Sequence, residues 1–255
     1  RKEDQRFLTG RGQFADDINV DGQAYAFMVT SVHAHADIRD IEISAAKDAP
    51  GVVDILTGAD WLEDGLGPIP HNLMFSSPPD IPLQNRDGSE RYVASHFPLP
   101  ADRARHVGQP IAMVIAETFS EAKDAAELVN VDYAPLTPVI DTSGAAETGS
   151  SVVWPDLGSN VAIDADVNDF RGSSAILEEA AHVVHLNTTL SRVTGIPMEP
   201  RSAVGNIDVD GRYILQTTGG SIYRFKRELA DLFNESEDHF RVIIRDVGGS
   251  YGPRN

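Results

Sequence analysis

Hydrophobic and polar residues alternate along the first half of the chain in a pattern that predicts short strands separated by helices. Apolar runs at 23–32 and 111–116 are typical of buried strands, and the period-two alternation of 38–43 predicts a half-buried strand. Helical spacing places the apolar residues of 120–129 on one face, with Ser120 as the expected N-cap. The other elements expected here are a short helix at 44–49 and strands at 52–56 and 129–133.

Residues 65–100 break this pattern. They are rich in proline and sustain no helical or strand period, so we expect irregular backbone with at most a modest helix. The small, polar segment 141–151 is the best linker candidate. We therefore place a domain of residues 1–140 before it and a second domain of residues 152–255 after it.

The second half is expected to combine one more helix with a hairpin and a crossover. Apolar spacing predicts a helix at 174–184, and 183–190 continues as strand-like sequence. Strands at 203–209 and 212–218 are expected to form a hairpin through Asp210-Gly211. A helix at 221–234 and a strand at 240–245 follow, so the fold class is α+β.

Two glycine-rich turns flank this last helix and strand. A crossover between parallel strands places both turns at the carboxyl ends of neighbouring strands, on one edge of the sheet, where bare backbone amides suit an anion such as phosphate. Neither turn matches a dinucleotide fingerprint or a P-loop, so ordinary tight turns with a helix cap stay the alternative. The candidate binding residues are Gly219, Gly220, Gly248, Gly249, Ser250, Tyr251 and Gly252.

Composition limits the classes of function. The net charge of −18 would repel a nucleic-acid backbone, and no apolar run reaches the ~18 residues that a membrane span needs. The absence of cysteine excludes disulfides, thiolate nucleophiles and any iron–sulfur cluster held by the chain itself. These features favour a cytoplasmic protein that binds neither nucleic acid nor membrane and takes any redox centre from elsewhere.

Two other groups of polar residues invite a chemical interpretation. His33 and His35 have the spacing to point the same way on a strand, but no third ligand lies near them, so we expect structural or exposed histidines and no metal site. Glu199 and Arg201 flank a proline and favour a buried structural ion pair over catalysis, because no nucleophile or second acid accompanies them.

Several ordered motifs resemble one family, the large subunits of molybdenum hydroxylases (the aldehyde oxidase, xanthine dehydrogenase and carbon monoxide dehydrogenase group). Residues 1–17, 31–36, 49–60 and 106–136 resemble its hammerhead domain. Residues 160–162, 192–201 and 246–254 look like the start of its molybdopterin-binding region. The resemblance implies a mixed-sheet hammerhead domain followed by a partial α+β molybdopterin-binding domain.

The resemblance also implies a chemistry. Members hydroxylate an aldehyde, a heterocycle or a similar small molecule with oxygen from water, at a molybdenum held by a pterin dithiolene, often in a dinucleotide form. The loop 248–252 corresponds to the family's cofactor loop, with Tyr251 in place of the usual Phe. Gly220 stands where the family usually has a Gln that reaches the metal ligands, and Asn255 where purine-oxidising members carry Glu.

In this family the large subunit continues further and works with iron–sulfur and flavin subunits. We therefore expect partners of three kinds: the remainder of the large subunit, an iron–sulfur subunit and a flavin subunit. The chain by itself is expected to bind no molybdenum cofactor tightly and to be inactive, with no catalytic residue assigned. A non-catalytic scaffold module is the alternative, a nucleotide-binding module is a weaker one, and an exposed apolar edge allows a homo-oligomer.

Overall fold

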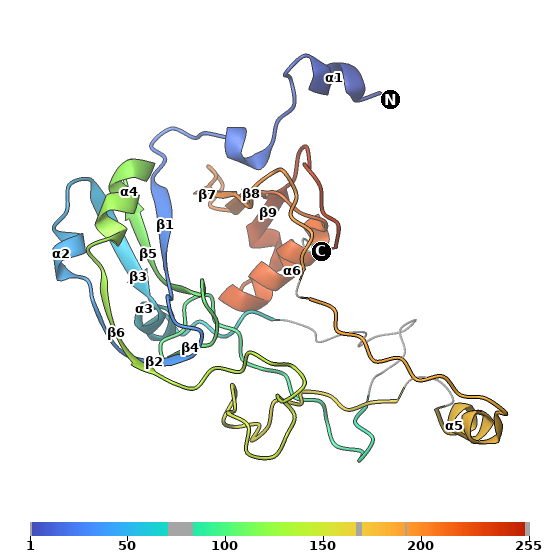
Figure 1. The fold of residues 1–255 in the computed structure, drawn as a ribbon. Helices are drawn as coiled ribbons and strands as arrows, with labels where there is room; N and C mark the ends of the chain where they lie inside the picture. The colour runs from blue at the N-terminus through green and yellow to red at the C-terminus, as the bar shows by residue number, and fades with distance from the viewer. Residues whose placement is uncertain (1, 71–83, 167–169, 192, 253–255) are drawn as a thin grey trace. The chain divides into compact units, whose positions relative to one another are not determined.

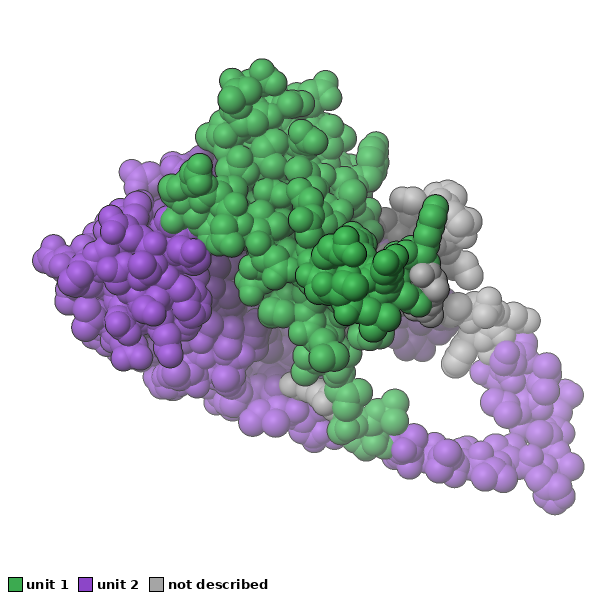
Figure 2. Space-filling view, turned by 90° about the horizontal axis from the view of Figure 1, so that it is seen from above, with its two compact units in different colours: residues 1–23, 189–255 green, residues 24–188 purple. Residues whose placement is uncertain are grey.

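The computed structural model describes residues 2–70, 84–166, 170–191 and 193–252 (Figure 1). The chain forms two compact units, drawn in different colours in Figure 2. Ala24–Thr188 make one unit, and Arg1–Gln23 together with Thr189–Asn255 make the other. This division differs from the predicted boundary at 141–151, which stays a prediction.

The first sheet of the unit 24–188 is antiparallel, in the order β1-β5-β3. Its strands are β1 (Tyr25–Thr30), β5 (Pro110–Ala116) and β3 (Val52–Thr57). The apolar run predicts the central strand correctly, because a strand paired on both edges and covered by helices excludes polar side chains. Two helices pack beside it, α4 (Phe119–Ala126) and α2 (Ser44–Lys47).

The core of this unit lies between the first sheet and those helices. Its small alanines let helix and sheet approach closely, while the branched side chains fill the space between them. The buried cluster consists of Ala46, Ile55, Val114, Ala125 and Ala126.

A second antiparallel sheet in the same unit has the order β4-β2-β6. Its strands are β4 (Arg103–Ala104), β2 (Ala36–Glu42) and β6 (Asn130–Pro135). The helix α3 (Gly58–Glu63) follows β3 directly and starts with a capping box between Thr57 and Asp60. Asp60 accepts hydrogen bonds from the N–H of Thr57 at 2.7 Å and from its hydroxyl at 2.6 Å.

Three local expectations are wrong. The N-cap of α4 is Thr118 and not Ser120; its hydroxyl accepts from the N–H of Glu121 at 3.2 Å, so the helix begins earlier. The helix α5 spans Phe170–Glu179, and Ile176 on its predicted apolar face is 72% exposed. Residues 183–190, all described, form no strand. Most of the stability of a helix in a protein comes from packing of its apolar face, so apolar spacing alone does not lengthen α5.

The proline-rich segment is irregular wherever it is described: 65–70 and 84–100 contain no helix or strand, and 71–83 lie outside the described residues. Hydrogen bonds tie it to a later stretch of the same unit. The N–H of Tyr92 donates to the carbonyl of Ala162 at 3.0 Å, and Arg86 pairs with Asp164. Nearby, the side-chain amide of Asn160 donates to the carbonyls of Ala145 and Ser151, which orders the loop around 145–153.

The other unit contains a three-stranded mixed sheet in the order β7-β8-β9. The hairpin is confirmed: β7 (Ala203–Ile207) pairs antiparallel with β8 (Tyr213–Thr217). β8 pairs in parallel with β9 (Phe240–Ile243). The crossover between them is α6 (Ile222–Phe233) followed by the short 3₁₀ helix η2 (Glu237–His239).

α6 lies against this sheet (Figure 1). An aromatic cluster joins the helix to the strands. The rings of Tyr213, Phe233 and Phe240 have centroids 5.4–6.3 Å apart, within the range of favourable aromatic contacts. Asn234 ends the helix in the left-handed conformation that Asn tolerates at a C-terminus. The same unit includes the N-terminal elements α1 (Asp4–Leu8) and η1 (Ala15–Asp17).

Candidate functional site

The two glycine turns lie at the carboxyl ends of neighbouring parallel strands, as the sequence predicts. β8 ends at Thr217 and runs into Gly219-Gly220, while β9 ends at Ile243 and runs into the loop 246–252. The register places Gln216 opposite Ile243, so both turns leave the sheet at the same edge. Ser221 caps α6 by accepting from the N–H of Arg224 at 3.2 Å, which places the first turn at a helix N-terminus.

A buried carboxylate joins the two turns. Glu199 is 7% exposed, and its Oε2 accepts the hydroxyl of Thr218 at 2.6 Å and the N–H of Gly248 at 2.7 Å. The amide of Gly248 is therefore not one of the bare amides expected in these turns. Arg201 is exposed, and the expected pairing of Glu199 with Arg201 stays a prediction beside these contacts with the turns.

Glycine is required in the second turn for two different reasons. At Gly248 an added Cβ would lie less than 3.0 Å from the Cβ of Glu199, so a side chain there would force Glu199 itself to move. At Gly249 the backbone has φ +114°, which L-residues rarely adopt, and the ring of Tyr251 occupies the space of a Cβ. Tyr251 itself has φ +51° and is 77% exposed.

A second buried carboxylate anchors the N-terminal segment to the same loop. Asp246 Oδ2 accepts the N–H of Gln13 at 2.7 Å, and the N–H of Asp246 donates to the carbonyl of Gln13 at 3.1 Å. Asp246 Oδ1 pairs with Arg6 of α1, and Arg245 donates to the side chain of Gln13. Residues at the two ends of the sequence thus hold the start of the loop in place.

Main-chain donors remain available at this edge. Among the described residues, the N–H groups of Gly219, Gly220 and Gly249 have no hydrogen-bond acceptor, and Gly219 is buried. Backbone N–H groups without an acceptor in the protein can donate to a ligand, so this edge suits a ligand that brings oxygen atoms. Gly220 brings no side-chain donor of its own, and Asn255 lies outside the described residues. The candidate residues therefore lie together, and their role in binding stays a prediction.

The two histidines have the structural roles expected of them. His35 is buried, and its Nδ1 lies 3.0 Å from the carbonyl oxygen of Thr137. The ring of His33 packs edge-on against the ring of Tyr133, with the two ring centroids 4.9 Å apart. No group of three or more histidine or acidic side chains suited to a metal occurs in the described part of the chain.

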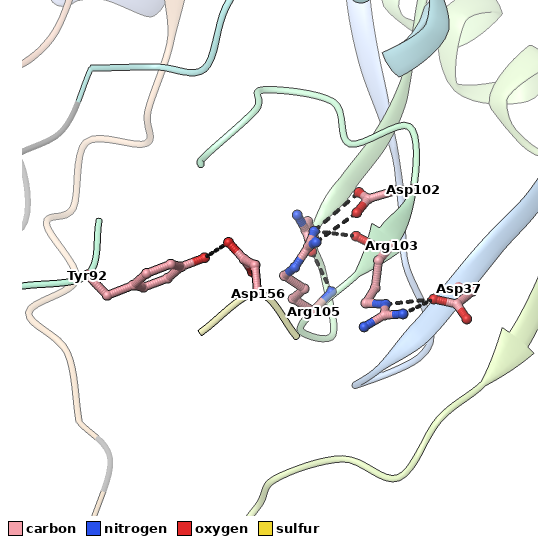
Figure 3. A network of polar contacts seen from close by, with 7 residues as sticks. Asp37, Tyr92, Asp102, Arg103, Arg105 and Asp156 are labelled. Atoms are coloured by element: carbon pink, nitrogen blue, oxygen red, sulfur yellow. Dashed lines mark hydrogen bonds and ion pairs between the residues drawn. The ribbon is translucent and has the colours of Figure 1, made fainter. Parts of the chain in front are cut away.

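A polar network in the unit 24–188 has no counterpart in the sequence-based predictions (Figure 3). The guanidinium of Arg105 lies 4.0 Å from the centre of the Trp154 ring and donates to Asp102 at 2.8 Å. Burial raises the pKa of Asp102, but the hydrogen bonds and charge of Arg105 outweigh it and leave that pKa below its ordinary value. Burial and a 2.7 Å hydrogen bond to Asp156 raise the pKa of Tyr92 to about 12.

This network fastens the stretch after the predicted linker to the proline-rich segment. Its members come from two stretches of sequence, 92–105 and 154–156, and follow no motif, so no local signal reveals the contacts between them. The neighbouring pair of Arg103 with Asp37 links β4 to β2 in the same picture. None of the helices in the described part of the chain is both long and apolar enough to cross a membrane.

Comparison with known proteins matches two family models to most of the chain. Residues 9–76 and 73–137 match the aldehyde oxidase and xanthine dehydrogenase a/b hammerhead domain, and residues 153–255 match a molybdopterin cofactor-binding domain. The solved quinoline 2-oxidoreductase from Pseudomonas putida 86 superposes with a TM-score of 0.84 at 28% identity over 100% of this chain. It confirms the α+β fold class.

Two curated relatives align over nearly the whole chain. The gamma subunit of the 6-hydroxypseudooxynicotine dehydrogenase complex from Paenarthrobacter nicotinovorans is 32% identical, and the carbon monoxide dehydrogenase large chain from Afipia carboxidovorans is 28% identical. Each alignment covers 99% of this chain and 30% of the relative. The chain thus spans about a third of the length of these relatives, which are subunits of larger assemblies.

Proposed function

Because the chain belongs to the aldehyde oxidase and xanthine dehydrogenase family of molybdenum hydroxylases, we propose that it forms the N-terminal portion of the molybdenum-cofactor subunit of an oxidoreductase. The complete enzyme hydroxylates an aldehyde, a heterocycle or a similar small molecule and takes the oxygen from water. The match of residues 153–255 to a molybdopterin cofactor-binding domain supports the cofactor. When bound, the molybdenum accepts the two electrons of that oxidation.

The observation that carries the proposal is the shared edge of the two glycine turns. The N–H groups of Gly219, Gly220 and Gly249 would donate to oxygen atoms of the cofactor, because no described residue accepts from them. Ser250, Tyr251 and Gly252 continue this surface, and the adjoining α6 N-terminus favours negative charge. Gly248 contributes through its backbone position, since its own N–H is held by Glu199. A dinucleotide form of the pterin is the form we propose.

The remaining parts of the proposal concern assembly. The relatives are named as gamma or large subunits of complexes, which supports partner subunits for this chain. We propose that these supply the iron–sulfur and flavin centres, because a chain without cysteine holds no iron–sulfur cluster itself. The rest of the large subunit completes the cofactor pocket, so activity requires the complete subunit.

The experiment is to purify the complete subunit that contains this chain with its partners, and to measure molybdenum and pterin per complex. Turnover of a panel of aldehydes and nitrogen heterocycles in ¹⁸O-labelled water then tests the reaction. We expect stoichiometric molybdenum and ¹⁸O in the product. Product without ¹⁸O contradicts the reaction. A complex that forms with its partners but holds no molybdenum contradicts the proposal in favour of a non-catalytic scaffold, a role consistent with Gly220 in place of the family's Gln.

A further inference from the structure

One oxygen atom of Glu199 ties together the two turns of the candidate site. Oε2 accepts from Thr218, directly after β8, and from Gly248, in the turn after β9. Both acceptor contacts are short, at 2.6 and 2.7 Å, and both Glu199 and Thr218 are buried. The side chain of Glu199 therefore joins the turns in addition to the β8–β9 ladder, which ends before either turn begins.

The chemistry of this contact makes it a strong one. Hydrogen bonds to an ionised carboxylate are shorter and stronger than those between neutral groups, and a buried carboxylate is costly to leave without them. The absence of a side chain at Gly248 is what allows the carboxylate to approach, because an added Cβ would collide with Glu199. Glu199 and Gly248 thus form a matched pair, and movement of either turn breaks it.

We propose that Glu199 is a positioning residue. It holds the turn after β9 against the turn after β8, so that the unused N–H groups of Gly219, Gly220 and Gly249 serve one ligand. The inference rests on the proposed function, since that ligand is the molybdenum cofactor. Glu199 does not itself present a donor to the cofactor, and it acts through the backbone that it fixes.

The first test measures hydrogen exchange of the Gly248 amide by ¹⁵N NMR in the chain itself. Glu199→Ala should speed this exchange by about 10- to 100-fold, the range for a lost hydrogen bond to a charged group. Glu199→Gln keeps an acceptor of the same reach and should restore most of the protection. Glu199→Asp keeps the charge but falls one methylene short, so it should behave like Glu199→Ala and carries the test if the alanine variant does not fold.

Asp60→Ala is the matched control. Asp60 also accepts one hydroxyl and one backbone N–H, both from Thr57, but it lies in the other compact unit. This variant should leave the exchange of Gly248 unchanged. The inference is overturned if the Gly248 amide exchanges equally fast in wild type and Glu199→Asp. It is also overturned if Glu199→Gln and Glu199→Asp speed that exchange equally, because the length of the side chain would then have no effect.

The second test measures molybdenum retained by the complete subunit after gel filtration. Wild type and Glu199→Gln should retain it, and Glu199→Asp should lose most of it. Full retention by Glu199→Asp overturns the positioning role. If wild type holds no molybdenum, the proposed function fails, while the exchange of Gly248 still decides separately whether Glu199 fixes the turns.

Discussion

Replacing Gly248 by Ala tests the packing at the candidate site directly. The new Cβ would lie less than 3.0 Å from Glu199 Cβ and 3.3 Å from Glu199 Oε2, whereas two carbon atoms prefer about 3.5–4.0 Å. Relieving such an overlap in a packed region costs about 1–3 kcal/mol of unfolding free energy. Moving Glu199 away also weakens its charge-assisted hydrogen bond to the Gly248 N–H, which adds about 1 kcal/mol or more.

A total near 2–4 kcal/mol should be clear in differential scanning calorimetry, because 1 kcal/mol shifts the melting midpoint of a small domain by about 4–8 °C. Gly205→Ala in β7 is the control: no atom lies within 4 Å of its added Cβ and its φ is not positive, so it should be neutral or slightly stabilising. The reasoning is refuted if Gly248→Ala melts like the wild type, or if Gly205→Ala is destabilised equally.

Three further perturbations test other parts of the structure. Thr118→Ala removes the N-cap of α4 and should cost about 1 kcal/mol in urea unfolding, whereas Ser120→Ala should cost little. Asp246→Ala removes the acceptor of Gln13 and Arg6, so limited trypsin digestion should release the N-terminal segment faster; unchanged digestion would contradict the anchor. The raised pKa of Tyr92 means that its stabilising effect is complete below the ordinary tyrosine value near 10 and is lost as pH rises towards about 12. Asp156→Asn should lower that pKa in an ultraviolet titration referenced to Tyr92→Phe, and an unchanged pKa would exclude the Asp156 contribution.

Local pattern predicts the elements well where a single periodicity decides. The apolar run of β5 and the strand–glycine–helix–strand order from β8 to β9 are both visible in sequence, because burial of a strand and of a crossover helix imposes simple spacings. It follows that the shared edge of the two turns is also predictable. Parallel pairing alone places both turns there.

Local sequence pattern fails where the structure depends on a contact between residues far apart in sequence, or on whether an apolar helix face is buried. Glu199 is 19 residues from Thr218 and 49 from Gly248, so no spacing rule connects them. The helix α5 ends at Glu179 although the apolar spacing continues, because Ile176 on that stripe is 72% exposed and the described residues do not bury it. The N-cap of α4 is misplaced because Thr118 and Ser120 are both good capping residues.

The most direct test of the central claim compares amide hydrogen exchange in the complete subunit with and without its molybdenum cofactor. If the edge of the two glycine turns holds the cofactor, the amides of Gly219, Gly220 and Gly249 should exchange more slowly in the loaded protein, while those of the β7–β8 hairpin turn at Asp210-Gly211 stay unchanged. Equal exchange of the three glycines in both states would contradict the account.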